Sequence, residues 1–175
     1  FSALGSNNVK NLGSLKVSAP IKEPNKHLLK KIDSVSKDKI VIVAASTHEG
    51  EEKIILESLK KLDIRKIEYL LIIVPRHINR GVEINDKFKL NAKLRSNNKF
   101  PSKDDKIWIA DSFGELSSFY SVSDIVIVGG SFYPFGGHNP AEPCNFKNSI
   151  IIGPYISKCQ DTVAEMIKSN AIIKL

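Results

Sequence analysis

The sequence has 175 residues, of which 42% are hydrophobic and 26% are charged, and its formal net charge is +7. This length accommodates one ordinary domain and is too short for two. No apolar run is long enough to cross a bilayer, and the first residues lack the pattern of a signal peptide. The composition is therefore that of a globular protein without a membrane-spanning segment.

The positive charge is compatible with a polyanionic partner, such as nucleic acid, an anionic lipid surface or a phosphorylated substrate. Most of it comes from lysines spread among isoleucines and asparagines, without the clustered arginines and interleaved aromatic residues of a nucleic-acid groove. We therefore expect no nucleic-acid partner. A solvated lysine-rich surface is the simplest interpretation, and affinity for an acidic membrane face is the alternative.

The two cysteines, Cys144 and Cys159, have neither metal-ligand spacing nor a secretory context. They predict free thiols in a reducing compartment, which favours a cytoplasmic setting. The chain begins with Phe1 and stops at Leu175, directly after the apolar residues 171–173. We therefore expect it to be a piece of a longer protein.

Residues 1–38 are polar and rich in lysine, and they include Pro20 and Pro24. They predict an interdomain linker or the end of a preceding domain, with one short strand near residues 15–17. From residue 39 onward, apolar runs rich in β-branched residues alternate with amphipathic stretches. The runs predict strands at 40–45, 69–74, 107–110, 124–128, 149–152 and 171–173, and the stretches predict helices at 51–62, 79–90, 114–120, 141–146 and 159–169.

Short continuous apolar strands separated by helices are typical of a parallel sheet that helices cover on both faces. The sequence therefore predicts an α/β, Rossmann-like fold for residues 39–175, truncated at its carboxyl end. The polar segment 91–105 is predicted to be a loop without obvious chemistry.

A glycine-rich segment follows the predicted strand 124–128: residues 129–143 read Gly-Gly-Ser-Phe-Tyr-Pro-Phe-Gly-Gly-His-Asn-Pro-Ala-Glu-Pro. Glycines let the backbone approach a ligand closely, and Asn139 before Pro140 predicts a helix N-cap with its first-turn proline. Glu142 would then lie near an anion held at the helix end. In the alternative, Glu142 belongs to a capping box and only ties down the turn's own backbone.

Three further polar loops follow predicted strands, and ligands of open parallel sheets bind beyond the carboxyl ends of strands. Residues 46–52 read Ser-Thr-His-Glu-Gly-Glu-Glu, residues 75–77 read Pro-Arg-His, and residues 111–116 read Asp-Ser-Phe-Gly-Glu-Leu. The guanidinium of Arg76 suits a phosphate, and free amides near a helix start suit a phosphate or a base edge. Each loop alone is also compatible with ordinary helix caps or a surface arginine. Their convergence at one sheet edge favours a nucleotide-phosphate pocket.

Other catalytic signatures are absent from the sequence. It contains no G-x-x-x-x-G-K-[ST] loop, no G-x-G-x-x-G after a strand and no G-x-S-x-G elbow. His48, His77 and His138 fall on separate loops without metal-ligand spacing. We therefore expect neither a bound metal nor a cofactor, and no serine hydrolase chemistry.

Together these motifs resemble one family. Ala-Ala-Ser-Thr-His-Glu-Gly-Glu-Glu at 44–52, Val-Pro-Arg-His at 74–77, the motif at 111–116 and the segment at 129–143 resemble, in order and spacing, the 3-deoxy-D-manno-octulosonic acid (Kdo) transferases of lipopolysaccharide synthesis. The resemblance runs from about Gly13 onward. It implies the C-terminal, donor-binding domain of a two-domain GT-B glycosyltransferase. Such an enzyme transfers Kdo with inversion from CMP-Kdo to a lipid A precursor, lipid IVA, at the cytoplasmic face of a Gram-negative inner membrane.

The resemblance also implies roles for particular residues. Those expected to bind CMP are Pro75, Arg76, Phe113, Gly114, Glu115, Asn139, Pro140, Ala141 and Glu142. Those expected to face the donor sugar and the interdomain cleft are Ser46, Thr47 and His48. The catalytic base and the acceptor site are implied to lie in an N-terminal domain outside this sequence, so we expect the fragment alone to be inactive.

Two alternatives remain at this point. The chain could be the donor domain of another GT-B enzyme that uses a UDP or GDP sugar. It could also be a non-catalytic α/β module that binds polyanions through the same helix ends.

Overall fold

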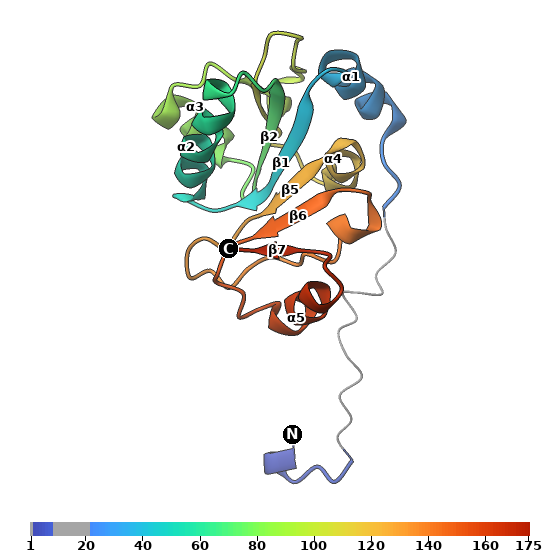
Figure 1. Ribbon diagram of the computed structural model, residues 1–175. Coiled ribbons are helices and arrows are strands. Elements are labelled where there is room, and N and C mark those ends of the chain that lie inside the picture. The colour runs from blue at the N-terminus through green and yellow to red at the C-terminus, as the bar shows by residue number, and fades with distance from the viewer. Residues whose placement is uncertain (1, 9–21) are drawn as a thin grey trace.

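Seven parallel strands form one sheet in the order β3-β4-β2-β1-β5-β6-β7 (Figure 1). The computed structural model describes residues 2–8 and 22–175. The strands are β1 Ile40–Thr47, β2 Tyr69–Pro75, β3 Lys93–Leu94, β4 Ile107–Ile109, β5 Ile125–Val128, β6 Ser149–Ile152 and β7 Ile173–Lys174. The predicted α/β, Rossmann-like parallel sheet is therefore confirmed.

The two longest strands, β1 and β2, lie in the middle of the sheet and are apolar on both faces. Side chains alternate between the faces of a strand, so Val43 and Ile72 belong to one core and Ile42 and Leu71 to the other. All four are at most 3% exposed. The continuous runs of β-branched residues are thus explained by burial on both sides.

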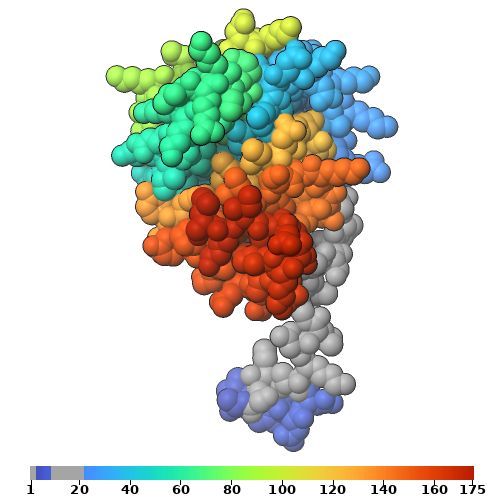
Figure 2. All heavy atoms as spheres, viewed as in Figure 1, coloured from blue at the N-terminus to red at the C-terminus, as the bar shows by residue number. Residues whose placement is uncertain are grey.

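Helices cover both faces of the sheet, as predicted. Their bounds are α1 Lys26–Ser36, α2 Glu51–Ile64, α3 Arg80–Phe88, α4 Leu116–Val122 and α5 Gln160–Lys168, with short 3₁₀ turns at Ser2–Leu4, Arg95–Asn97 and Pro143–Asn145. Apolar residues of α1, α4 and α5 join the core on one face, and those of α2 and α3 join the core on the other. In the space-filling view, α2 (turquoise) and α3 (green) lie at the opposite end of the domain from α5 and β7 (red) (Figure 2).

Helix α1 lies within residues 1–38, which were predicted to be a linker or the end of a preceding domain, without a helix. Leu28 and Ile32 are 1% and 0% exposed and pack in the core. The side chain of Asn25 caps the helix by accepting hydrogen bonds from the amides of residues 27 and 28. The backbone N–H of Asn25 in turn donates to the hydroxyl of Ser118 in α4 at 2.8 Å. Helix α1 is therefore an integral layer of the domain.

The predicted helix 141–146 is wrong, because only a 3₁₀ turn, Pro143–Asn145, forms there. The side-chain amide of Asn145 donates to the carbonyls of Ala141 and Glu142 at 3.2 and 3.1 Å, and so occupies acceptors that a helix would use. Phe146 then adopts an extended conformation. The chain therefore leaves this turn directly for β6.

The remaining differences are small. The segment predicted as a loop, 91–105, contains β3 and the 3₁₀ turn Arg95–Asn97, and the strand expected near residues 15–17 lies outside the described residues. Cys144 and Cys159 are both free, as predicted. Among the helices that the structure describes, none combines the length and the apolar character that crossing a membrane requires.

Candidate functional site at the carboxyl edge of the sheet

The site lies where β1 and β5 are neighbours in the sheet. The chain leaves these two strands toward opposite sides of the sheet. Strand β1 leads to β2 on one side, and β5 leads to β6 on the other. Ligands of open parallel sheets bind at such a switch point, between the loops that follow the two strands, and we call this position the crevice. These loops touch here, because a side chain on Gly129 would lie only 2.4 Å from the carbonyl oxygen of Ser46. Ser46 itself adopts a left-handed φ of 56° at an irregularity in β1.

Glu51, the first residue of α2, ties the two loops together. Its side chain is fully buried. One carboxylate oxygen accepts from the amides of His48 and Gly130, both at 2.8 Å, and the other accepts from the amides of Ser131 and Phe132, both at 2.9 Å. These glycine-rich-loop amides are the groups that would otherwise suit an anion. They are therefore occupied by the chain's own carboxylate.

Thr47 lies in the wall behind the crevice rather than on its surface. It is 0% exposed, and its hydroxyl donates to Glu52 at 2.8 Å. Glu52 also pairs with Arg80 of α3, with Nη1 and Oε1 at 2.8 Å. The geometry gives Thr47 a supporting position, in which it anchors the loop that carries Ser46 and His48.

Three aromatic rings meet in the crevice. His48 and His138 approach through their Nε2 atoms at 2.8 Å, and Phe135 stacks on His48 with ring centroids 4.3 Å apart. Burial, followed by the charges of His48 and Arg76, lowers the pKa of His138 to about 4. Burial also lowers the pKa of His48, and the negative charge of Glu51 opposes that shift only in part. His138 was absent from the predicted site.

Arg76 follows β2 directly beside this cluster. Its backbone amide donates to the carbonyl of Thr47 at 3.0 Å and extends the β1–β2 pairing. Its side chain is exposed, and within the described residues its guanidinium forms no ion pair. The positive charge of Arg76 nevertheless acts on both His48 and His138. Pro75 is buried as the last residue of β2, so Arg76 is the available group.

The loop after β4 presents free backbone amides. Within the part of the chain that the structure describes, the amides of Phe113, Gly114 and Glu115 donate no backbone hydrogen bond. Gly114 has a left-handed φ of 76°, which favours glycine at this position. Phe113 is 91% exposed. This loop therefore offers donors and an uncovered aromatic ring to a ligand.

Side chains from the segment 91–105 hold this loop in position. Arg95 makes a two-pronged contact with the Glu115 carboxylate, at 3.1 and 3.0 Å, and the hydroxyl of Ser112 donates to the same carboxylate. Ser96 donates to Asp111 through its amide and its hydroxyl, at 2.8 and 2.6 Å. Residues in the segment predicted to lack chemistry thus position the loop.

Asn139, Pro140, Ala141 and Glu142 follow His138 in the chain. The Asn139 side chain accepts from the amide of Ala141 at 3.1 Å, which makes an Asx turn. Because no α-helix begins here, the expectation of a helix end facing the phosphate is corrected. Glu142 is exposed, and it makes no capping hydrogen bond with the turn, so the capping-box alternative is not realised.

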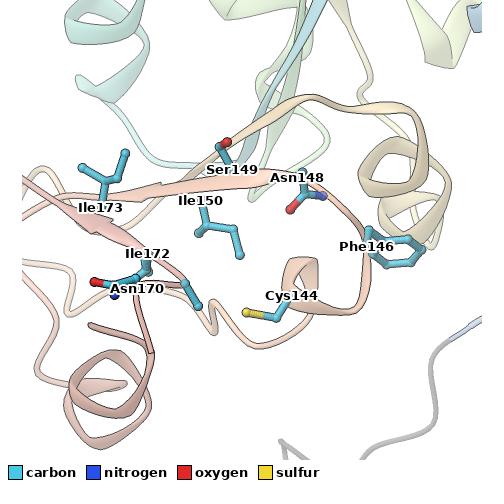
Figure 3. Close-up of a pocket in the computed structure, with 9 residues that line it drawn as sticks. Cys144, Phe146, Asn148, Ser149, Ile150, Asn170, Ile172 and Ile173 are labelled. Carbon is cyan, nitrogen blue, oxygen red and sulfur yellow. The ribbon is translucent and has the colours of Figure 1, made fainter. Parts of the chain in front are cut away.

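The residues that the structure describes contain no group of three or more His, Cys, Asp or Glu side chains that could hold a metal ion. A hollow of about 280 Å³ lies at the opposite edge, where β6 and β7 begin (Figure 3). Its uncharged lining consists of Cys144, Phe146, Asn148, Ser149, Ile150, Asn170, Ala171, Ile172 and Ile173. An uncharged lining offers a phosphate no ionic partner, so the candidate site remains at the carboxyl edge.

Comparison with known proteins decides the family. The chain superposes on a crystal structure described as the C-terminal CMP-Kdo binding domain of WaaA from Acinetobacter baumannii, with a TM-score of 0.74 and 31% identity over 86% of this chain and 83% of that chain. The chain belongs to the Kdo transferase family. The resemblance noted in the sequence is thereby confirmed, as is the fold of a C-terminal GT-B domain. No model of a protein family matches the sequence.

Curated relatives agree with this assignment. A 3-deoxy-D-manno-octulosonic acid transferase from Rickettsia bellii is 38% identical over 100% of this chain and 42% of the relative. The corresponding protein from Haemophilus influenzae is 37% identical over 86% of this chain and 37% of the relative. The chain thus spans about two fifths of the length of these Kdo transferases.

Proposed function

We propose that this chain binds CMP-Kdo as the donor domain of a Kdo transferase. The observation that carries the proposal is its 31% identity to a domain described as binding CMP-Kdo, with a TM-score of 0.74. The loops after β1, β2 and β5 support it. Arg76, which forms no ion pair within the described residues, lies there beside His48 and His138, and such sheets bind nucleotides at this position.

In this proposal, the guanidinium of Arg76 binds the phosphate of CMP. Its exposure and its lack of an ion pair in the described residues support this role. The amides of Phe113, Gly114 and Glu115 bind the nucleotide, and the exposed carboxylate of Glu142 binds the ribose hydroxyls. Ser46 and His48 then face the sugar, while Thr47 holds their loop in place.

The proposed chemistry is inverting displacement of CMP by a hydroxyl of the lipid A precursor. The leaving group is a monophosphate, so a guanidinium and oriented amides can stabilise its developing charge. A general base from the N-terminal domain, outside this chain, would take the proton of the acceptor hydroxyl. The fragment alone should therefore bind the donor without turning it over.

The proposed location is the cytoplasmic face of a bacterial inner membrane. The net charge of +7 supports an attraction to anionic lipid. The chain should associate with vesicles that contain an anionic phospholipid and should dissociate as salt is added, whereas neutral vesicles should not retain it. Binding that ignores lipid charge would contradict this location.

Calorimetric titration with CMP and with UDP tests the nucleotide. We expect CMP to bind, at roughly millimolar strength if half of a two-domain site is present, and UDP to bind more weakly. Arg76→Ala and Glu142→Ala should each weaken CMP binding about tenfold or more. Arg65→Ala and Glu68→Ala are matched controls, because both residues are exposed at the opposite edge of the sheet.

Three other results would each favour a different function for the chain. Preference for UDP would assign the site to another class of sugar donor. Tight RNA binding with a steep dependence on salt, unchanged by Glu142→Ala, would favour a polyanion-binding module. Equal loss of CMP affinity in the Arg65→Ala control would show that surface charge, and not the crevice, binds the nucleotide.

A further inference from the structure

The rings of His48 and His138 share a hydrogen bond in a common plane. Their Nε2 atoms are 2.8 Å apart and the ring planes differ by 13°. The centroids are 5.0 Å apart, which matches the Nε2 distance plus the two ring radii. The rings therefore meet edge to edge, as a nitrogen lone pair requires when it accepts an N–H.

This contact restricts the protons that the pair can carry. In the neutral pair, the donor ring holds its proton on Nε2 and the acceptor ring holds its proton on Nδ1. One more proton fits on the free Nδ1 of the donor ring without disturbing the contact. A second additional proton would place hydrogens on both facing Nε2 atoms and separate the rings. The pair therefore has a neutral state and a singly charged state of the same shape.

The surroundings of the pair are mostly positive. The charged and titratable groups that act on it are Glu51 from α2, Arg76 and His77 after β2, Arg80 from α3 and Lys158 before α5. The only carboxylate among these five already accepts four backbone amides. Burial and this positive field keep the pair neutral near pH 7 when the crevice is empty.

We propose that His48 and His138 form one anion-binding unit, which takes up a single proton when an anionic group enters the crevice. An anion beside the rings reverses the balance of charge and stabilises the singly charged state. Phe135 covers one face of His48, so the anion meets the pair along the ring edges or the opposite face. The identity of the ligand rests on the proposed function, in which the phosphate and the sugar carboxylate are both anions.

Nitrogen-15 NMR of the histidine rings tests the unit directly, and only four histidines contribute signals. In the free chain near pH 7, we expect one neutral Nε2–H ring and one neutral Nδ1–H ring. Addition of CMP, and separately of inorganic phosphate, should convert one of these two rings to imidazolium. His27 provides an internal reference, because it lies on α1 and the pair does not contact it.

Calorimetry in buffers of different ionisation enthalpy gives the second measurement. CMP binding should take up protons, and CMP affinity should fall as the pH rises from about 6.5 to about 8. His138→Gln should remove that uptake and weaken binding about tenfold, and His27→Gln should do neither. The titration of the CMP phosphate itself is common to all these proteins and cancels in the comparison.

The outcomes separate this inference from the proposed function. If CMP binds while both rings keep their neutral signals, the inference is overturned and the CMP site stands. If phosphate charges the pair while CMP does not bind, the inference stands and the proposed ligand is wrong. If neither anion changes the ring signals, or if both free rings show the same tautomer, the anion-binding unit is refuted.

Discussion

The carboxylate of Glu51 lies 2.9 Å from the backbone amide of Ser131, although the two residues are 80 positions apart in the sequence. The negative charge of Glu51 is balanced by four amide dipoles, and no basic side chain forms an ion pair with it among the described residues. One buried side chain therefore holds the loops after β1 and β5 in a fixed relation, on which the crevice depends.

Glu51→Gln should destabilise the domain strongly. The glutamine NH2 group is a hydrogen-bond donor and would face backbone N–H groups that are donors as well. At least one buried backbone N–H therefore loses its acceptor. We expect a loss of about 2–4 kcal/mol in the free energy of unfolding, measured by urea denaturation. Glu49→Gln is the matched control, because Glu49 is exposed and, among residues 2–8 and 22–175, forms an ion pair with Lys87 alone. It should change stability by less than about 0.5 kcal/mol. Similar values for the two variants would contradict the assigned role.

Gly129→Ala should also destabilise the domain, for a steric reason. The new methyl group would lie 2.4 Å from the backbone oxygen of Ser46, and a backbone atom in a strand pair cannot move aside easily. We expect a loss of about 2 kcal/mol or more and weaker CMP binding. Gly5→Ala meets no atom within 4 Å and should affect CMP binding least. An unchanged melting curve for Gly129→Ala would show that the two loops can separate freely.

Arg95→Ala should weaken nucleotide binding more than it weakens the fold. Arg95 and Glu115 are 20% and 15% exposed in their side chains, and their pair orders the loop that carries the free amides. We expect about a threefold to tenfold loss in CMP affinity with about 1 kcal/mol lost in stability. Arg95→Lys should rescue binding only in part, because an ammonium cannot make the two-pronged contact.

Lys93→Ala serves as the control for Arg95. Lys93 pairs with Asp105 at 2.8 Å in the same part of the chain, but this pair does not touch residues 113–115. The CMP affinity of Lys93→Ala should therefore equal that of the unmodified chain. Equal losses in both variants would mean that the free amides are not the nucleotide contact.

The free energy of unfolding should fall as the pH is lowered from about 7 to about 5. The pKa of His138 is lowered to about 4 in the folded state, whereas the unfolded state binds a proton near pH 6.5. The unfolded state therefore binds more protons in this window, and acid favours it. Allowing for the solvent that reaches the ring, we expect about 1–2 kcal/mol. Asp105, whose pKa is lowered by its hydrogen bonds to Lys93 and Ser102, contributes only at lower pH.

Urea unfolding at the two pH values checks this prediction. His138→Gln should flatten the dependence on pH, because its side chain does not titrate. His27→Gln should leave the dependence unchanged, since His27 is an exposed residue of α1. A dependence that survives in His138→Gln would assign the proton uptake to another group.

The fold was largely predictable from the sequence because the central strands are buried on both faces. Residues 40–45 and 69–74 are unbroken apolar runs, and both proved to be strands. Helix α1 was missed because its lysines mask the spacing of Leu28 and Ile32, its two buried apolar residues. The helix expected at 141–146 failed because a side-chain hydrogen bond of Asn145 competes with the backbone, which composition does not reveal.

The candidate site was predictable as a set of loops but not as a set of contacts. Parallel strands place the ends of β1, β2, β4 and β5 at one edge, so the strand pattern of the sequence was enough to predict which loops lie together. The His48–His138 bond joins residues 90 positions apart, and only the adjacency of β1 and β5 brings them together. Glu51 was likewise read as part of a helix start, because its partners in residues 130–132 depend on the same adjacency.

The position of Glu51 also predicts that a variant of the domain can bind a small carboxylate. Its removal in Glu51→Ala would leave four convergent N–H groups around a space of carboxylate size. Formate should fill that space and raise the melting temperature of the variant in a concentration-dependent way, with little effect on the unmodified chain. The interior of the domain thus contains a binding site for one carboxylate. In the unmodified chain, the side chain of Glu51 occupies that site.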